Sequence, residues 1–304
     1  MSNKKKDKQP VIGICALCKK ESELKLSHII PKFVFRALKK DSFTGKLRLS
    51  NEPNRAIQDG EKMHLLCGEC EKNFNEFETI FSNKVFIPFK NDGFNTTLKY
   101  DGDWLCRFIT SVSWRILFLD IKYFEEEQDP KKKIDTKRLL LLKKSEEIMR
   151  KYLLKERINI DNIKNHIFFF DTVEEAGGLF NPHTTIQGSV FGFSVGYNQE
   201  DTFYVMSNLL GIIIVTIIKE HSQEKWRNTF VKNEPGKIKL PQIVDSPVMS
   251  EISRIQSKLE TYKTDLSENQ RKQILDKINN DIEGFKNSGS YRRLMLDEKL
   301  KEKQ

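Results

Sequence analysis

The chain has 304 residues, of which 38% are hydrophobic and 31% are charged, and its formal net charge is +9. This balance is typical of a soluble globular protein with room for two domains. No uncharged apolar run reaches the roughly 18 residues that a membrane-spanning helix needs, and no apolar segment follows the lysine-rich start. We therefore expect a cytoplasmic protein with no membrane contact.

The positive charge is concentrated at the start of the chain. Residues 1–50 hold 13 Lys and Arg against four Asp and Glu, which accounts for the whole surplus of nine. A basic module beside a neutral remainder suggests a polyanion partner, and nucleic acid is the commonest one. The lysines of residues 4–8 could equally well solubilise a tail, and Arg55 could simply belong to a turn. The residues that we predict to contact phosphates are Lys19, Lys20, Lys25, Lys32, Arg36 and Arg55.

Four of the five cysteines form two short pairs, Cys15-Ala16-Leu17-Cys18 and Cys67-Gly68-Glu69-Cys70, with 48 residues between the pairs. Two residues between cysteines let both sulfurs turn towards one point, so the pairs can close a tetrahedral shell around one Zn²⁺. A shell of four thiolates has no open position for substrate, so the zinc is predicted to be structural. Reduced thiols also fit the cell interior better than disulfides do. Cys106, in an apolar run, is predicted to be a buried small hydrophobe.

Between the two pairs stands the segment Leu26-Ser27-His28-Ile29-Ile30-Pro31. Together with the cysteine pairs it resembles the first motif of the HNH endonucleases, whose ββα-metal site is built on a treble-clef zinc frame. The resemblance covers about the first 80 residues and implies metal-dependent hydrolysis of phosphodiester bonds. It implies His28 as the general base that activates water, and a single divalent ion, Mg²⁺ or Mn²⁺, that stabilises the leaving oxygen.

Three positions depart from the family's pattern. Ser27 stands where the family has a metal-binding Asp or His, and a hydroxyl is a poorer ligand. Lys62 stands where the middle Asn usually sits, so Asn54 or another loop residue would have to take that role. Glu71 stands where the family has a His after the second cysteine pair, and its carboxylate keeps a Mg²⁺ or Mn²⁺ site feasible.

A helix should follow the second cysteine pair. Its apolar stripe would hold Phe74, Phe77 and Phe81. A second face beside that stripe would hold Glu71, Asn75 and Glu78 and could look towards His28. The alternatives are a solvated acidic face and, for His28, a core histidine that bonds a backbone carbonyl. The predicted catalytic residues are His28, Glu71, Asn75 and Asn54.

The remaining elements complete an α+β prediction: a zinc-stapled ββα module over residues 1–90 and a helical and antiparallel-sheet domain of unknown role over residues 91–304. In chain order we expect a short amphipathic helix over 31–40, a loop or hairpin over 41–59, and a linker with one or two short strands over 85–100. Helices should fill about 103–157, an antiparallel sheet about 166–218, and a C-terminal helix about 250–285. The run 209–218, apolar on both faces, fits a central strand, and the tail after Gly289 should be frayed.

Three functional hypotheses follow. The first is an HNH-like endonuclease with DNA favoured over RNA, and the resemblance adds an expectation of bacterial genome defence. The second is a non-catalytic, zinc-stapled nucleic-acid-binding module. The third is a structural subunit of a larger complex. Residues 100–304 contain no motif for phosphate or dinucleotide binding. We therefore expect the body of the protein to recognise a target, to form a homo-oligomer or to bind a protein partner.

Overall fold

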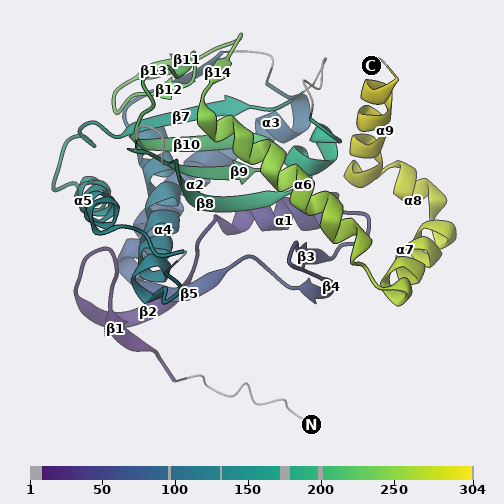
Figure 1. Ribbon diagram of the computed structural model, residues 1–304, viewed down its shortest axis with the longest axis horizontal. Helices are drawn as coiled ribbons and strands as arrows, with labels where there is room; N and C mark the ends of the chain where they lie inside the picture. The colour runs from purple at the N-terminus through teal and green to yellow at the C-terminus, as the bar shows by residue number, and fades with distance from the viewer. Residues whose placement is uncertain (1–8, 95–96, 131, 172–178, 198–200, 303–304) are drawn as a thin grey trace.

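The computed structural model describes residues 9–94, 97–130, 132–171, 179–197 and 201–302 (Figure 1). These residues combine helices with antiparallel sheets, which confirms the α+β prediction. Within them, no helix is both long enough and apolar enough to cross a membrane. The lysines of residues 4–8, discussed above as a solubilising tail, lie outside the described residues.

Residues 12–81 carry the four cysteines predicted to bind zinc and are called the zinc-bearing segment. The segment is built on a three-stranded sheet whose order is β1 (Ile12–Ile14), β2 (Glu21–His28) and β5 (Lys62–Cys67). The helix predicted after Pro31 is α1 (Lys32–Asp41). The region predicted as a loop or hairpin contains the hairpin of β3 (Leu47–Leu49) and β4 (Glu52–Ile57). The helix predicted after the second cysteine pair is α2 (Gly68–Phe81), and it buries Phe74 and Phe81 as the apolar stripe requires.

The predicted linker over residues 85–100 is helical in its first half, which corrects that prediction. A π-helical turn, η1 (Ser82–Phe86), continues α2 and leads into α3 (Ile87–Asp92). Val85, Phe86 and Phe89 recur at helical spacing and are buried, so their burial favours helix over strand. One of the expected short strands is present as β6 (Leu98–Tyr100).

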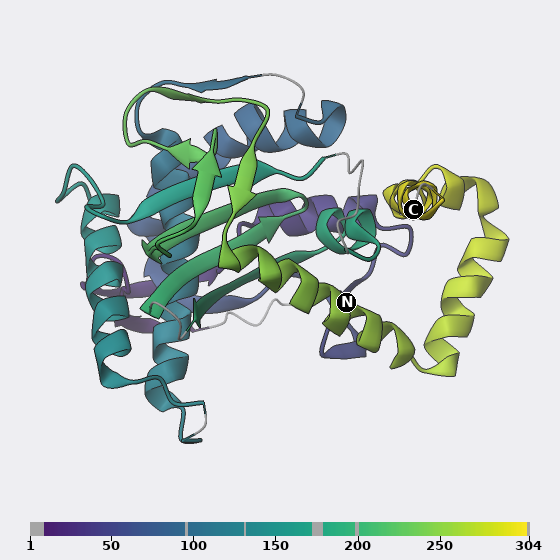
Figure 2. The ribbon, with the colours of Figure 1, turned by 45° about the horizontal axis from the view of Figure 1, so that its top comes forward.

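The centre of the molecule is a five-stranded antiparallel sheet. Its order is β12 (Phe230–Val231), β7 (Lys164–Phe169), β10 (Ile212–Lys219), β9 (Thr202–Leu209) and β8 (Val190–Tyr197). Helix α4 (Trp104–Glu126) packs on one face and is itself covered by α5 (Thr136–Leu153). A short 3-10 turn, η4 (Pro247–Met249), and α6 (Ser250–Thr264) cover the other face (Figure 2).

Strand β10 shows why this sheet needs two covering layers. Ile212 and Ile214 belong to the core that contains α4, whereas Ile213 and Val215 belong to the smaller core beneath α6. Successive side chains of a strand point to opposite faces, so a strand buried on both faces is continuously apolar. The predicted central strand is therefore confirmed.

Part of the region predicted as antiparallel sheet, residues 166–218, is helical in the structure. Residues 183–187 form a π-helical turn, η2 (His183–Gln187), and the strand starts at Val190. The turn is held from outside the sheet, because the buried Asp297 carboxylate accepts the backbone N–H groups of His183 and Thr184, both at 2.9 Å. A partner more than 110 residues away along the chain thus decides this local structure.

The C-terminal region differs most from the sequence-based expectation. Instead of one helix over 250–285 there are three, α6, α7 (Glu268–Asn280) and α8 (Ile282–Lys286), and the tail expected to fray forms α9 (Gly289–Lys301). Ser267, Asp281 and Ser288 each cap the following helix with a side-chain oxygen. Helix α9 is anchored by an ion pair from Arg293 to Asp41 at the end of α1. Figure 1 shows these helices as an arm that reaches back towards β3 and β4.

The short strands that remain lie beside the main sheet. β11 (Lys225–Arg227) pairs with β14 (Ile243–Asp245), and β13 (Gly236–Ile238) pairs with β6. β6 immediately precedes α4, so this pairing fixes the entry of the chain into the central helix.

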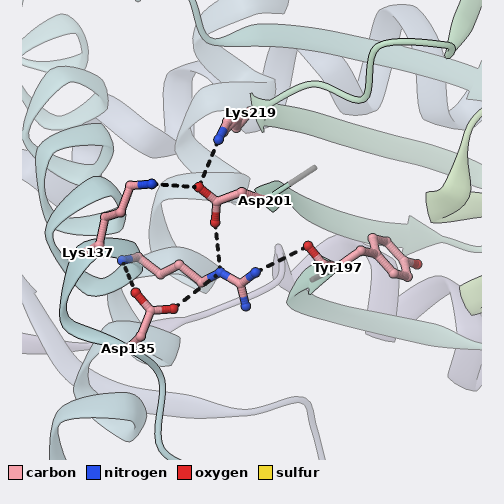
Figure 3. A network of polar contacts seen from close by, with 6 residues as sticks. Asp135, Lys137, Tyr197, Asp201 and Lys219 are labelled. Atoms are coloured by element: carbon pink, nitrogen blue, oxygen red, sulfur yellow. Dashed lines mark hydrogen bonds and ion pairs between the residues drawn. The ribbon is translucent and has the colours of Figure 1, made fainter. Parts of the chain in front are cut away.

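A network of charges joins α5 to the sheet at the turn that precedes β9 (Figure 3). The Asp201 carboxylate accepts hydrogen bonds from Lys219 Nζ at 2.8 Å and Arg138 Nε at 2.9 Å, and Lys137 Nζ lies 3.5 Å away. These hydrogen bonds hold the pKa of Asp201 well below its usual range. Arg138 also donates to the carbonyl of Tyr197 at 3.4 Å. The network therefore connects α5 to the last residue of β8 and to the residue that precedes β9.

We expect Asp201→Asn to lower the melting temperature modestly at pH 7. Asparagine tolerates the left-handed backbone of residue 201, whose φ is 55°, so the substitution removes the charge and leaves the turn intact. A carboxylate with a lowered pKa stabilises the fold above its unfolded pKa, and that contribution is lost as the pH falls through the folded value. Melting curves at low and high salt measure the effect, which should shrink as salt screens these exposed charges. A difference that is unchanged in 1 M salt would argue against an electrostatic origin.

Candidate metal centre and histidine site

The four paired cysteines meet at one point. Cys15 and Cys18 lie in the turn between β1 and β2, whereas Cys67 ends β5 and Cys70 lies in the first turn of α2. Their sulfur atoms all lie within 4.8 Å of one another, and those of Cys18 and Cys67 are 3.9 Å apart. Ligands in a tetrahedral zinc–thiolate shell stand about 3.8 Å apart, given Zn–S bonds of about 2.3 Å. The donor set and its spacing therefore fit the structural zinc that the sequence predicts.

The first cysteine pair is shaped by its backbone. Lys19 N–H donates to the Cys15 carbonyl and Cys15 N–H donates to the Lys20 carbonyl, both at 2.9 Å, which closes a tight turn. Lys19 adopts a left-handed conformation, with φ of 62°, to complete that turn. The backbone N–H of Cys67 points at Cys15 Sγ from 3.3 Å. An N–H directed at sulfur stabilises a thiolate, so the loop is preformed for metal binding.

Burial of the four-cysteine cluster favours the binding of a cation. Cys15, Cys67 and Cys70 are buried, and burial raises the pKa of the Cys70 thiol far above its ordinary value. Without a cation that thiol stays protonated, because a buried thiolate has no compensating charge. Zinc supplies that charge and releases the protons, so binding contributes directly to folding. Cys106 is a buried residue of α4 and is not part of the cluster, as its apolar sequence context suggested.

His28 ends β2 and forms a pair with an acidic residue that the sequence reasoning did not include among the catalytic candidates. Its Nε2 lies 2.8 Å from Asp59 Oδ2, and both side chains are mostly buried. Burial alone would raise the pKa of Asp59, but the hydrogen bonds from His28 and from Gly60 N–H outweigh it and lower that pKa. An ionised Asp59 can only accept, so Nε2 carries a hydrogen, and in the neutral ring Nδ1 is then the nitrogen that keeps a lone pair.

Gly60 explains why Asp59 occupies this place. A Cβ at residue 60 would lie 2.1 Å from the ring of Phe35 on α1, so only glycine lets the chain turn so close to that helix. The dipeptide Asp59-Gly60 is recognisable in the sequence as a turn, but its proximity to His28 depends on the β2–β5 pairing across 31 residues.

Ser27 and Glu71, which stand at the two metal-binding positions of the family's pattern, contact each other. Ser27 Oγ donates to Glu71 Oε2 at 2.7 Å, and Ser27 is completely buried. Because neighbouring side chains of a strand alternate, Ser27 faces α2 while His28 faces Asp59. Lys62, at the usual Asn position, lies opposite His28 in the sheet, with Nζ 3.5 Å from Asp59 Oδ2.

The other predicted catalytic side chains lie elsewhere. Asn75 is exposed on α2. Asn54 is engaged by the connection between α6 and α7, since its Nδ2 donates to the Asp265 carbonyl at 2.9 Å and its Oδ1 accepts Ser267 N–H at 2.8 Å. Glu78 faces inward and contacts Arg115 of α4, with Oε1 2.9 Å from Nη2. The acidic face of α2 is therefore not simply solvated.

The basic residues that we predicted to contact phosphates are all exposed: Lys19, Lys20, Lys25, Lys32, Arg36 and Arg55. Two of them form surface ion pairs, Lys25 with Glu23 at 2.8 Å and Arg55 with Glu52 at 3.1 Å. Such exposed pairs are worth little, so a phosphate could replace the carboxylate at small cost. Their exposure leaves them accessible to a nucleic acid.

Asp120, near the end of α4, has a carboxyl group whose pKa differs strongly from its ordinary value. Burial raises the pKa of Asp120 to about 6, although its carboxylate accepts the Ser194 N–H of β8 at 2.7 Å. The negative charge of Glu61, next to β5, adds to that rise. The hydrogen bond to Asp120 thus joins α4 to β8, the edge strand of the main sheet. At neutral pH it leaves a negative charge in a poorly solvated position.

We expect Asp120→Asn to stabilise the protein above pH 7. The native state binds the Asp120 proton more tightly than the unfolded chain, whose Asp pKa is near 3.9. The free energy of unfolding of the wild type therefore falls, by on the order of 2 kcal/mol, as the pH rises from about 4 to about 6. The amide oxygen of asparagine can still accept the Ser194 N–H. Melting temperatures should thus differ at pH 7.5 and converge near pH 4, and a difference of equal size at both values would refute the assignment.

Comparison with protein-family models, with curated proteins and with solved structures finds no match to this chain.

Proposed function

We propose that the zinc-bearing segment is an HNH-like, metal-dependent endonuclease site in which His28 is the general base. The pairing of His28 with the ionised Asp59 carries this proposal, because it leaves Nδ1 as the proton acceptor and fixes the ring. General-base catalysis needs a proton acceptor that is held in place within reach of the attacking water, and a histidine ring oriented by a carboxylate is such an acceptor. Water is the proton donor, and its hydroxide would attack a phosphodiester.

The metal position that the family resemblance implies falls on Glu71 and Ser27, whose side chains meet between α2 and β2. Glu71 is the residue that would hold Mg²⁺ or Mn²⁺, with Ser27 orienting its carboxylate through the 2.7 Å hydrogen bond. Such ions are commonly bound through one or two carboxylates and several waters, so one carboxylate is an adequate donor set. The ion would supply charge stabilisation for the leaving oxygen. The treble-clef frame belongs to the same proposal: one cysteine pair in a turn, the other at the junction of β5 and α2, and a single zinc between them.

The second candidate function is a non-catalytic nucleic-acid-binding module. Ser27 favours it, because a completely buried hydroxyl already bonded to Glu71 leaves little of the metal site that the family's Asp or His provides. The exposed basic residues serve this function as well as the first.

One assay separates the two. The purified zinc-loaded protein is incubated with supercoiled plasmid, linear duplex DNA, single-stranded DNA and RNA, each with Mg²⁺, Mn²⁺ or Ni²⁺, and binding to the same substrates is measured without divalent ions. Metal-dependent cleavage that disappears in His28→Ala while binding persists supports the nuclease. Binding without cleavage in every metal, equal in wild type and variant, supports the binding module.

A further inference from the structure

Arg115 lies in the middle of α4 and is 2% exposed, so its guanidinium has no access to substrate. It contacts three groups instead. Its Nη1 donates to the backbone carbonyl of His28 at 2.9 Å, Nε donates to the Ser111 carbonyl at 3.1 Å, and Nη2 lies 2.9 Å from Glu78 Oε1. The guanidinium also stands 5.3 Å from the centre of the Phe74 ring.

A buried charge is retained at a cost, so its contacts are informative. Desolvating a guanidinium is compensated only by good pairing, and hydrophobic residues often stabilise a core equally well. The Glu78 carboxylate, with 14% of its side chain exposed, neutralises the charge. The ion pair between Arg115 and Glu78 does not by itself require the hydrogen bond from Arg115 to the His28 carbonyl. This hydrogen bond runs from α4 to the end of β2. The contact joins the zinc-bearing segment to the body at the residue proposed as the base.

His28 is therefore held at two points. Asp59 fixes the ring through Nε2, and Arg115 fixes the backbone carbonyl of the same residue. The following residue is held as well, since Ile29 N–H donates to the Glu61 carbonyl at 3.1 Å. Displacing a catalytic group by about 1 Å can lower a rate about 100-fold, so the second anchor matters for chemistry as well as for packing.

We propose that Arg115 is a positioning residue for His28, so that the proposed site is complete only when α4 is packed against β2 and α2. This inference rests on the proposed function for its catalytic consequence. Its structural content, that Arg115 fixes the imidazole of His28 through the backbone, can be tested without any activity.

The test compares two charge-neutral double variants of the full chain. Arg115→Met with Glu78→Gln removes the anchor and leaves no unpaired charge behind. Arg107→Met with Asp103→Asn is the matched control, because Arg107 is a second buried arginine of α4 that pairs with an acid, Asp103, at 2.6 Å and has no contact with His28. Both variants should lose comparable thermal stability and keep one zinc per chain. Only the Arg115 variant should lower the cleavage rate, by roughly 100-fold.

The second readout is the ¹⁵N spectrum of the histidine rings, in which His28→Ala identifies the His28 signals. In wild type they should show a single tautomer with hydrogen on Nε2, and in the Arg115 variant they should move towards tautomer averaging. The Arg107 variant should leave them unchanged. Unchanged His28 signals in the Arg115 variant, or equal losses of cleavage in both double variants, would overturn the inference. If wild type cleaves nothing, the proposed function fails and the ring spectra still decide whether Arg115 positions His28.

Discussion

Replacing His28 with alanine is expected to lower the rate of phosphodiester cleavage about 1000-fold, because positioned general-base catalysis contributes roughly 100- to 10,000-fold. Alanine removes the proton acceptor and leaves Asp59 with Gly60 N–H and Lys62 as its remaining partners. Nucleic-acid binding should be unchanged, because the exposed lysines and arginines around the module are untouched. Initial rates of plasmid nicking at a fixed metal concentration measure the loss.

His64→Ala is the control for this experiment. His64 belongs to the same small sheet, on β5, and is exposed, with Nδ1 3.1 Å from the Leu24 carbonyl. It contacts neither Asp59 nor Glu71 in the part of the chain that the structure describes. Its replacement should leave cleavage within a few-fold of wild type. Equal rates for wild type and His28→Ala would rule out His28 as the base.

Cys67→Ser is expected to have the largest effect on stability. A structural zinc site contributes about 10–16 kcal/mol of apparent binding free energy at pH 7, which is comparable to the whole stability of a typical domain. Serine is a poor zinc ligand, although it keeps the backbone N–H that residue 67 directs at Cys15 Sγ. We expect the variant to lose its zinc and to unfold the zinc-bearing segment, as chelation of the wild type should do.

The damage should spread into the body of the protein. Phe81 of α2 stacks on Phe108 of α4 with ring centres 3.7 Å apart, and Phe33 of α1 packs against both. Zinc content and thermal unfolding, followed by circular dichroism, measure the effect. Cys106→Ala is the matched control, because it removes the one cysteine outside the cluster and should keep one zinc per chain. A Cys67→Ser protein with full thermal stability would refute the zinc assignment.

Features that depend on residues near one another in the sequence could be predicted more readily than features that depend on long-range contacts. Two cysteine pairs at short spacing need only a turn and a strand end to meet, so their convergence could be inferred from spacing alone. Strand β10 was recognisable because burial on both faces leaves a continuous apolar run. The two cysteine pairs are 48 residues apart, but each pair is a complete short motif, and strand β10 is a single continuous run.

The missed features depend on partners far away along the chain. Asp59 lies at the end of the region predicted as a loop or hairpin, but its contact with His28 follows from strand register. A tail after Gly289 is expected to fray because the last residues of a chain are usually poorly ordered. In the structure, however, Asp297 and Arg293 of α9 are buried against His183, Thr184 and Asp41. Buried charges that bind backbone N–H groups look like solvated ones in a sequence.

The β3–β4 hairpin is synthesised well before the C-terminal arm to which it is hydrogen-bonded. Asn54 bonds to Asp265, 211 residues later, and Arg48 donates to Gln270, 222 residues later, at 2.7 Å. Because ribosomes add about 5–20 residues per second, the hairpin emerges about 10–40 s before its partners exist. During that interval the zinc shell can close and order β1, β2, β5 and α2, since all four ligands are made by residue 70. Metal binding therefore does not have to wait for the contacts between the arm and the β3–β4 hairpin.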